Sequence, residues 1–586
     1  MKELKHIVLL SLLMPIVGFA QSTQNQSSNF KARIDSLYRA EMKANKVVGV
    51  SIAIVDNHEI AYAQGYGFAD LESRIPVTPE TSFRVGSITK SFTAIAIMQL
   101  NEKGLLNLDE PITTYLPELK TNELSPNATP ITLRHLLSHT SGLPSEFYNG
   151  FLCDAPPQGD WLMEQLNQQK KLYPANFKHI YSNLGYALLG EVIARVSKQP
   201  YAEYIRQHIF QPLHMASGYI HAPGQTKAPS IAKGYHGMKP AIEPYIRDQA
   251  AGSICASADD MAQFISMWLQ NGSYSGSQLV TQNSVSEMQR NQLSTILLKE
   301  KNEWGLGLQI KKYQVQNQVI NAWGHPGDTF AFHADYAFIP ELQIGVVVLT
   351  NSSSGQEMNA AEKLLRLYLS SEYKKELRKA APPLLPLETW ERSGSWNDIQ
   401  GDYLNSRFVM RITQPDKIKV RQGVASLILS RKQNFSYSVN AQLLGFIRFP
   451  IRDMGVQFVK VNEYTLLKLI QKDENEFSYQ SLKQPASSKI TLAWKNRLGN
   501  YSIMPGFFAC NQCTYGDLSK LKMTLSEDNG YLKIQFSNAP FSRTNFLSVV
   551  NDSLAITSGV DRDSGMNLTA LEDGTLAFSG LRFQKK

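Results

Sequence analysis

Beyond its first twenty residues, the chain lacks any apolar run that approaches the ~20 residues of a membrane-spanning helix. It also lacks a basic patch with interleaved aromatics, which argues against nucleic-acid binding although the formal net charge is +8. The 11 histidines include no H-E-x-x-H spacing of the kind that binds zinc in metalloproteases. We therefore predict no nucleic-acid partner, no metal and no transmembrane anchor.

Cysteine is scarce, with only 4 in 586 residues, and this excludes a disulfide scaffold as the main source of stability. Cys510 and Cys513 form a C-N-Q-C motif, which can close a small loop in an oxidising compartment. Two thiols alone cannot complete a zinc site. Cys153 and Cys255 are as compatible with two buried thiols as with a pair, so disulfide pairing stays open.

The first twenty residues have the pattern of a secretory signal peptide. Basic residues stand near the start, an apolar run extends from Ile7 to Val17, and small residues precede Gln21. This pattern predicts cleavage after Ala20. Because glutamine rather than cysteine follows the predicted cut, we expect no lipid attachment and a soluble protein that is periplasmic or secreted.

The next part of the chain, residues 21–378, alternates between β-like and helical patterns. Helices are expected over residues 29–44, 89–100, 132–138, 160–170, 184–197, 201–209, 258–270 and 356–377. Strands are expected in a hairpin that turns at Asp56 to His58, and over residues 304–310, 330–339 and 344–350. This order predicts an α+β domain whose antiparallel sheet is completed by segments far apart in the sequence.

A proline-rich linker, residues 379–396, separates this domain from a tail of short β-like runs. Within the tail, Gly-x-Tyr occurs at 401–403 and again at 499–501, each time after a tryptophan. This weak repeat predicts two β-barrel or sandwich modules, residues 397–484 and 490–586. The alternative is one larger β domain with a coincidental match.

Serine stands three positions before lysine five times in this chain, with the serines at positions 28, 87, 230, 371 and 519. Only Ser87 follows a glycine at the start of an expected helix, where Lys90 would share its face. The free amides and positive dipole end of a helix N-terminus stabilise a developing oxyanion and disfavour an ammonium ion. Both effects favour Ser87 as a nucleophile and Lys90 as its base.

Two downstream segments hold further candidates. Tyr181 and Asn183 stand just before an expected helix, where a phenol can pass a proton and an amide can orient a substrate carbonyl. His325 and Gly327 precede an expected strand, whose edge amide can complete an oxyanion hole. Each pattern is weak alone, since Tyr-x-Asn recurs at 403–405 and a lone histidine is more often structural.

Taken in order, seven segments resemble the serine hydrolases related to class C β-lactamases and penicillin-binding proteins. The resemblance covers about residues 29 to 378. It implies an antiparallel sheet flanked by helices, a helical subdomain, and a site in the cleft between them. The segments are VGVSIAIVDN, GYGFADLESRIPVTPETSFRVGSITKSFTA, ITLRHLLSHTSGLP, YSNLGYALLGEVIARVS, AAGSICASADDMAQF, WGLGLQ and GHPGDTFAFHADYAFIPELQIGVVVLTNS.

By position, the resemblance implies that Ser87 is acylated and that Lys90 is its base. It implies that Tyr181 assists proton transfer and that Asn183 holds the substrate amide. The oxyanion hole would consist of the backbone amides of Ser87 and Asp328. His325 and Gly327 would occupy the strand motif, where β-lactamases usually have Lys-Thr-Gly.

The histidine at position 325 departs from the family pattern. A histidine has a reference pKa of ~6.5 and is mostly neutral near pH 7, so it recognises a substrate carboxylate weakly. Family members with histidine here resemble esterases and D-amino-acid peptidases. Asp328 adds a negative charge that can meet a substrate amine.

The sequence therefore predicts an exported serine hydrolase that acts without a cofactor on small peptides, D-amino-acid derivatives or esters, with β-lactams as slow substrates. The alternative is a penicillin-binding or envelope-sensing protein that is acylated without efficient turnover. The C-terminal β modules, which resemble the barrels of D-aminopeptidases, are compatible with a role in restricting the cleft, in homo-oligomers, or in stability alone.

Overall fold

The computed structural model describes residues 30–586 apart from a set of gaps. The gaps are residues 121–128, 151, 154–155, 158–159, 172, 226–229, 299–301, 359, 381–399, 405–408, 413–416, 423–424, 432–435, 444–446, 462–463, 472–475, 486–487, 505–519, 538–543 and 559–564. The expected signal peptide, most of the proline-rich linker and the C-N-Q-C motif lie outside the described residues. Cys255 is buried and forms no disulfide in the part of the chain that the structure describes.

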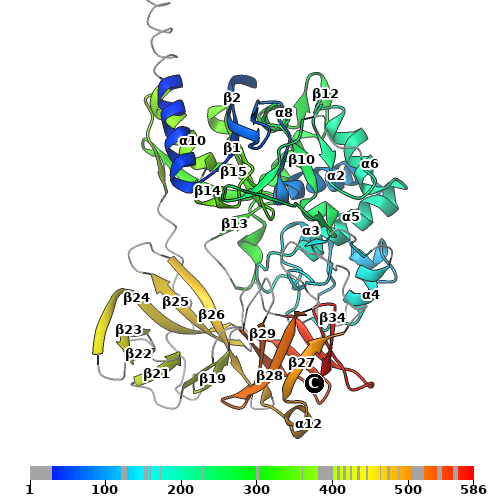
Figure 1. Ribbon diagram of the computed structural model, residues 1–586, viewed down its shortest axis with the longest axis vertical. Helices are drawn as coiled ribbons and strands as arrows, with labels where there is room; N and C mark the ends of the chain where they lie inside the picture. Colours follow the sequence, from blue (N-terminus) through cyan, green and yellow to red (C-terminus); the bar gives the residue numbers. More distant parts are fainter. Residues whose placement is uncertain are drawn as a thin grey trace, which may run out of the picture.

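A nine-stranded antiparallel sheet forms the centre of the N-terminal part (Figure 1), in the order β13-β14-β15-β16-β17-β1-β2-β3 with β18 beside β14. The strands are β1 (Gly49–Asp56), β2 (Glu59–Asp70), β3 (Ile75–Pro76), β13 (Glu303–Trp304), β14 (Gln309–Val315), β15 (Gln318–Asp328), β16 (His333–Ile339), β17 (Ile344–Thr350) and β18 (Leu377–Lys379). Strand β1 pairs with β17, from Val50 opposite Thr350 to Asp56 opposite Ile344. The expected α+β fold with a sheet closed by distant segments is confirmed.

Helices cover both faces of this sheet. The helix over residues 30–45 and α10 (Ala360–Glu372) pack on one face, while α2 (Thr89–Glu102) and α8 (Ala258–Leu269) pack on the other. Successive strand residues point to opposite faces. Ile52 and Ile54 of β1 accordingly belong to the hydrophobic cluster under α10, and Ala53 and Val55 belong to the cluster under α2 and α8.

A helical subdomain packs against α2. Its helices are α3 (Leu133–Leu137), α4 (Trp161–Asn167), α5 (Asn183–Ser197), α6 (Tyr201–Ile205) and α7 (Gln249–Gly252). The side chain of Ser182 caps α5 by accepting a hydrogen bond from the Gly185 amide. A Cβ at Gly190 would lie 2.7 Å from the Ala250 Cβ, so only glycine lets α5 and α7 approach this closely.

The C-terminal part contains two further β structures, which lie below the first sheet in Figure 1. The first is an eight-stranded antiparallel sheet of β19 (Gly401–Leu404), β20 (Val409–Ile412), β21 (Lys417–Gln422), β22 (Ala425–Arg431), β23 (Ser436–Leu443), β24 (Ile447–Val461), β25 (Tyr464–Gln471) and β26 (Glu476–Gln484). The second is a closed barrel of β27 (Gly499–Ile503), β28 (Lys522–Asp528), β29 (Tyr531–Ser537), β30 (Thr544–Val549), β31 (Leu554–Thr557), β32 (Asn567–Ala570), β33 (Leu576–Phe578) and β34 (Leu581–Lys585).

The repeated Gly-x-Tyr marks the same place in each β structure. Gly401 begins β19 with a φ of 146°, and Gly499 begins β27 with a φ of 145°. Tyr403 and Tyr501, two residues later, are both buried. The repeat in the sequence therefore corresponds to a repeat in local structure.

His325 and Gly327 precede strand β16, as expected, but they also lie in the long strand β15, which the sequence analysis did not predict. A second expectation about an element near the site was wrong. Residues 304–310 do not form one strand, because the chain turns between β13 and β14 at Gly305 and at Gly307, whose φ is 72°. The last helix is shorter than expected and is followed by β18.

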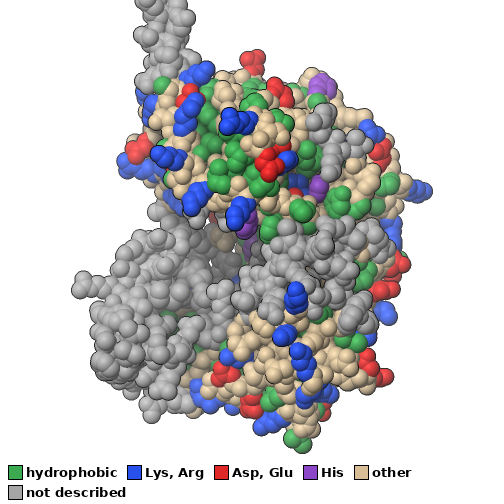
Figure 2. Space-filling model, viewed as in Figure 1, with side chains coloured by type: hydrophobic (Ala, Val, Ile, Leu, Met, Phe, Trp, Pro, Cys, Tyr) green, Lys and Arg blue, Asp and Glu red, His purple; other side chains and the backbone are tan. Residues whose placement is uncertain are grey.

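The described surface carries charge of both signs. On the face in Figure 2, Lys and Arg side chains are interspersed with Asp and Glu over the N-terminal part rather than gathered in one patch. None of the helices that the structure describes is long and apolar enough to cross a bilayer.

Candidate active site

Ser87 lies in a short 3-10 turn, η1 (Gly86–Ile88), that leads directly into α2. Two glycines let the end of β15 lie against this turn. A Cβ at Gly86 would lie 2.8 Å from the Asp328 backbone nitrogen, and a Cβ at Gly327 would lie 1.9 Å from the Val85 carbonyl oxygen. The backbone amide of Asp328 therefore lies next to the turn that carries Ser87. An oxyanion hole formed by the backbone amides of Ser87 and Asp328 requires this proximity.

Lys90 lies one turn further along, and its side chain is fully buried. Its Nζ is 3.2 Å from Ser87 Oγ, 2.8 Å from Asn183 Oδ1 and 2.7 Å from the Ala251 carbonyl oxygen. A neutral amine has two N–H groups and one lone pair. The Asn183 and Ala251 oxygens only accept, whereas the Ser87 hydroxyl carries a proton, so among these three contacts Ser87 is the group that can give a proton to the neutral amine.

Tyr181 lies beside this lysine at the start of the α5 segment. The Lys90 Nζ is 4.8 Å from the centroid of the Tyr181 ring. The ring packs on His139 at 4.2 Å and on Trp304 at 6.0 Å between centroids. His139 Nδ1 also accepts a hydrogen bond from the Ser182 amide at 3.0 Å, which holds the backbone just after the tyrosine.

Asn183 is the first residue of α5, and it bridges two groups of the site. Its Oδ1 accepts from Lys90 Nζ, and its Nδ2 donates to Glu146 Oε2 at 3.0 Å. The Glu146 carboxylate thus sets the orientation of the amide, because it accepts only and must face the NH₂ end. Sequence reasoning missed Glu146. The segment ITLRHLLSHTSGLP, which carries part of the family resemblance, ends two residues before Glu146. A single glutamate in a loop belongs to no recognisable sequence motif.

His325 is buried under the site and is only 2% exposed. It packs against Trp304 at 5.4 Å and Tyr181 at 6.2 Å between ring centroids. Burial, and then the nearby Lys90, lower the pKa of His325 to about 3, so the ring is neutral near pH 7. Its Nδ1 lies 2.5 Å from the Pro326 carbonyl oxygen, which makes Nδ1 the protonated nitrogen and leaves Nε2 as an acceptor.

Gly327 and Asp328 end strand β15, where they pair with Ala334 and His333 of β16. The Asp328 side chain is half-exposed, and its carboxylate accepts a hydrogen bond from His333 Nδ1. The structure therefore brings all seven predicted residues to the junction of η1, α2, α5 and β15. It directs the Asp328 carboxylate toward its strand neighbour.

The loop that carries Glu146 is held from several sides. The Ser145 carbonyl accepts from the Asn183 amide at 2.8 Å, and Arg247 Nη1 donates to the carbonyl of Asn149 at 2.5 Å. From the C-terminal barrel, the Gly580 carbonyl accepts from Asn149 Nδ2 at 2.8 Å. The barrel thus contacts the same loop that supplies a carboxylate to the site.

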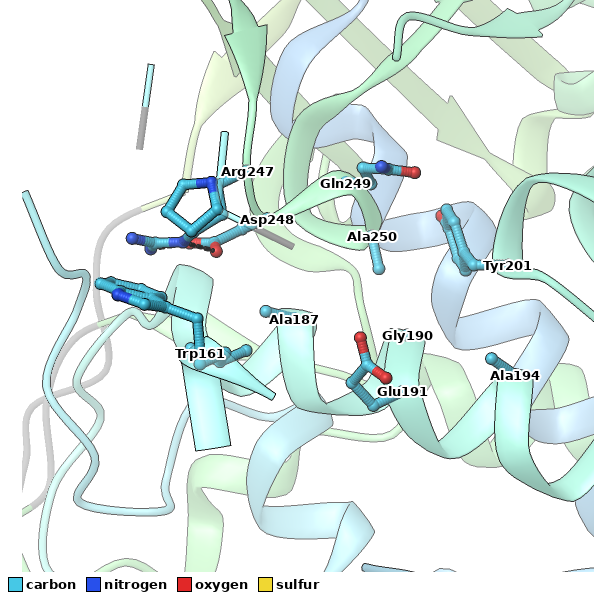
Figure 3. Close-up of a pocket in the computed structure, with 12 residues that line it drawn as sticks. Trp161, Ala187, Gly190, Glu191, Ala194, Tyr201, Arg247, Asp248, Gln249 and Ala250 are labelled. Carbon is cyan, nitrogen blue, oxygen red and sulfur yellow. Dashed lines mark hydrogen bonds and ion pairs between the residues drawn. The ribbon is translucent and has the colours of Figure 1, made fainter. Parts of the chain in front are cut away.

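A separate cavity of about 210 Å³ lies behind this loop, between α4, α5 and α7 (Figure 3). It is lined by the Arg247–Asp248 ion pair, by Trp161, whose ring centroid is 5.0 Å from the Arg247 guanidinium carbon, and by Glu191. None of the seven predicted site residues lines it. Asp248 and Trp161 hold the Arg247 side chain on its wall, and Arg247 in turn donates to the carbonyls of Phe147 and Asn149 in the loop.

In the comparison with protein families, the profile described as Beta-lactamase matches residues 34–370. Among curated proteins, penicillin-binding protein PbpX of Bacillus subtilis (strain 168) is 36% identical over 217 residues, which is 36% of this chain and 52% of that protein. Protein flp of Staphylococcus aureus (strain N315) is 27% identical over 342 residues, which is 56% of this chain and 64% of that protein. The chain thus spans between half and two thirds of the length of these relatives.

Among solved structures, the octameric penicillin-binding protein homologue from Pyrococcus abyssi is similar over most of the chain. The sequence identity is 25% and the TM-score is 0.51. The match covers 77% of this chain and 99% of that chain. The likeness therefore extends beyond the residues that the family profile matches.

Proposed function

The chain belongs to the beta-lactamase family, whose members are serine hydrolases, and from this premise we propose that it is an exported hydrolase that cleaves amide or ester bonds through an acyl-enzyme on Ser87. The observation that carries the proposal is the environment of Lys90. Two carbonyl oxygens, on Asn183 and Ala251, occupy two directions around its amine, and Ser87 Oγ occupies a third. This is the arrangement that a lysine base needs.

In the proposed acylation step, the Ser87 hydroxyl proton moves to Lys90 Nζ while Oγ attacks the substrate carbonyl carbon. The backbone amides of Ser87 and Asp328 stabilise the oxyanion. Tyr181 passes a proton to the leaving amine or alcohol as the bond to it breaks. A water molecule then attacks the carbonyl carbon of the acyl-enzyme, and its proton passes through Lys90 and Tyr181 to Ser87 Oγ. The bond between the acyl group and Ser87 breaks, which releases the acid and restores the serine hydroxyl.

Small peptides, D-amino-acid derivatives and esters are the proposed substrates, with β-lactams turned over slowly. The neutral state of His325 supports this choice, because it supplies no fixed positive charge for the carboxylate of a β-lactam or a D-Ala-D-Ala peptide.

The test is a hydrolysis panel of nitrocefin, p-nitrophenyl esters, D-aminoacyl anilides and D-Ala-D-Ala peptides. We expect Ser87→Ala to lower kcat/KM by at least ~10³-fold on every substrate that the wild type cleaves, because the variant lacks the hydroxyl on which the proposed acyl-enzyme forms. Ser371→Ala, a change at another Ser-x-x-Lys pair, serves as the matched control and should keep full activity. A Ser87→Ala protein with wild-type rates would refute the proposal.

The second candidate is a protein that is acylated but not turned over, and the similarity to a protein named penicillin-binding protein PbpX supports keeping it. A time course with a fluorescent penicillin and an activated ester separates the two functions. Mass spectrometry measures the adduct on Ser87 over time. Rapid loss of this adduct supports the hydrolase function. A persistent adduct without product release supports the penicillin-binding or sensing function.

A further inference from the structure

We propose that Glu146 binds an ammonium group of the substrate, so that the enzyme prefers substrates with a free amine next to the scissile carbonyl over their N-acylated forms. This inference rests on the proposed hydrolase function, because it assigns the acyl group that Ser87 receives. It names the substrate class as aminoacyl amides and aminoacyl esters.

The position of Glu146 follows from a chain of contacts that starts at the nucleophile. Ser87 Oγ is 3.2 Å from Lys90 Nζ, which is 2.8 Å from Asn183 Oδ1. The other end of the same amide, Nδ2, is 3.0 Å from Glu146 Oε2. One amine and one amide therefore separate the carboxylate from the reacting hydroxyl, and Glu146 is partly exposed rather than buried. An α-amine is one carbon away from the carbonyl that Ser87 attacks, so it enters the same region.

The hydrogen-bonding character of the site favours an ammonium over a carboxylate. An ammonium group offers three donors and no acceptor, whereas a carboxylate only accepts. The buried His325 ring carries no charge near pH 7, because burial lowers its pKa to about 3, so it supplies no positive charge for a substrate carboxylate. Glu146 and Asp328 both add negative charge, although the Asp328 carboxylate is engaged by His333. A substrate ammonium can donate to the Glu146 carboxylate, whereas a substrate carboxylate would meet it as a charge of the same sign.

The loop around Glu146 is held before any substrate arrives. The Ser145 carbonyl is bound by the Asn183 amide on the α5 side. On the other side, the carbonyl of Phe147 accepts from Arg247 Nη1 at 3.3 Å, and the Asn149 side chain is bound by the barrel. A carboxylate on such a preorganised loop loses little conformational freedom when it binds a ligand, which strengthens charge-assisted recognition.

Glu146 also orients Asn183, so the experiment must separate charge from positioning. Glu146→Gln keeps an acceptor oxygen for Asn183 Nδ2 and removes the charge. Glu146→Asp keeps the charge on a shorter side chain. If the carboxylate only positions Asn183, glutamine should replace it well; if its charge binds the substrate, glutamine should fail and aspartate should rescue part of the effect.

The test measures binding separately from turnover. In a Ser87→Ala background, calorimetry gives the Kd of D-alanyl p-nitroanilide and of its N-acetyl form. We expect the free amine to bind at least ~10-fold more tightly, an advantage within the range of a charge-assisted hydrogen bond, and we expect Glu146→Gln to abolish it. The remote variant Glu203→Gln is the matched control for loss of one surface carboxylate, and it should keep the advantage.

The pH gives a second readout. The preference for the free amine should fall as the pH rises through the pKa of an α-amino group, ~7.7–8.0, and this dependence should vanish in Glu146→Gln. Equal Kd values for the two ligands, or an advantage that survives Glu146→Gln, would overturn the inference. Failure of the proposed hydrolase function would be seen in a different measurement. Wild type and Ser87→Ala would then turn over the substrates equally, whatever the Kd values are.

Discussion

Two Ser-x-x-Lys pairs with the same spacing lie in different surroundings in this protein. At Ser87, the lysine three residues on is fully buried and contacts the serine hydroxyl. At Ser371, near the end of α10, the serine hydroxyl accepts from Arg33 Nη1 at 2.6 Å. Lys374 there turns back and donates to the Ser371 backbone carbonyl at 2.8 Å, and it does not contact the hydroxyl in the structure as described.

The difference shows what converts a common spacing into a candidate site. The partners of Lys90 come from α5 and α7, far away in the sequence, whereas Lys374 finds its partner within its own turn. A third pair supports this contrast: Lys233, three residues after Ser230, forms ion pairs with Asp70 and Glu72. These carboxylates raise the pKa of Lys233, which keeps it an ammonium ion and not a base.

The largest expected effect comes from removing each lysine in turn. Lys90→Met should lower kcat/KM by ~10³-fold or more on the best ester, because a positioned base contributes ~10²–10⁴-fold and Ser87 also loses its hydrogen-bond partner. Lys374→Met should leave the rate within about twofold, as a surface substitution away from the site does. Steady-state kinetics give kcat/KM for the two variants. An equal loss of kcat/KM in both would show that the two Ser-x-x-Lys pairs do not differ in function.

A pH titration tests the surroundings of the Ser87 pair. Burial lowers the pKa of His325 to about 3 and that of His135 to about 4, below the ~6.5 of an unfolded histidine. The unfolded state therefore binds more protons below about pH 6.5, so stability is full above that pH and declines as the pH falls toward 3. Each histidine contributes a slope of up to ~1.4 kcal/mol per pH unit.

The measurement is chemical unfolding of wild type and His325→Gln at pH 7 and pH 5. Glutamine takes up no proton, so the variant should lose less stability between the two pH values than the wild type does. A fall of the same size in both proteins would mean that His325 is not held neutral.

The smallest expected effect concerns another matched pair, two glycines at positive φ in the C-terminal barrel. Gly580 has a φ of 77°, and a Cβ there would lie 3.1 Å from the Asn149 Cβ and from the Trp161 ring. Gly574 has a φ of 80° with nothing within 4 Å of its Cβ position. Both alanine variants carry the same backbone strain.

Only Gly580→Ala also crowds the contact between the barrel and the loop before α4. We expect it to lower the free energy of unfolding by ~1–3 kcal/mol more than Gly574→Ala does. Thermal unfolding of both variants measures the difference. Equal losses would show that local conformation, and not the neighbours, decides the cost.

Much of the fold was readable from local pattern. The helix after Ser87, the β1–β2 hairpin and the repeated Gly-x-Tyr each depend on neighbours in the sequence, and all are confirmed. Strand β15 was missed because His-Pro-Gly is typical of a turn, and pairing with β14 and β16 overrides that preference. Glu146 was missed because its partner Asn183 lies on a different element.

The sequence by itself determined the family, the order of elements and the spacing of Ser87 and Lys90, because helical geometry places residues three apart on one face. Only the tertiary structure decided the chemistry of that pair. The acceptors around Lys90, the neutral state of His325 and the placement of Glu146 arise from burial and from contacts between distant segments. Burial and long-range contacts set charge and proton affinity, and no short stretch of sequence contains them.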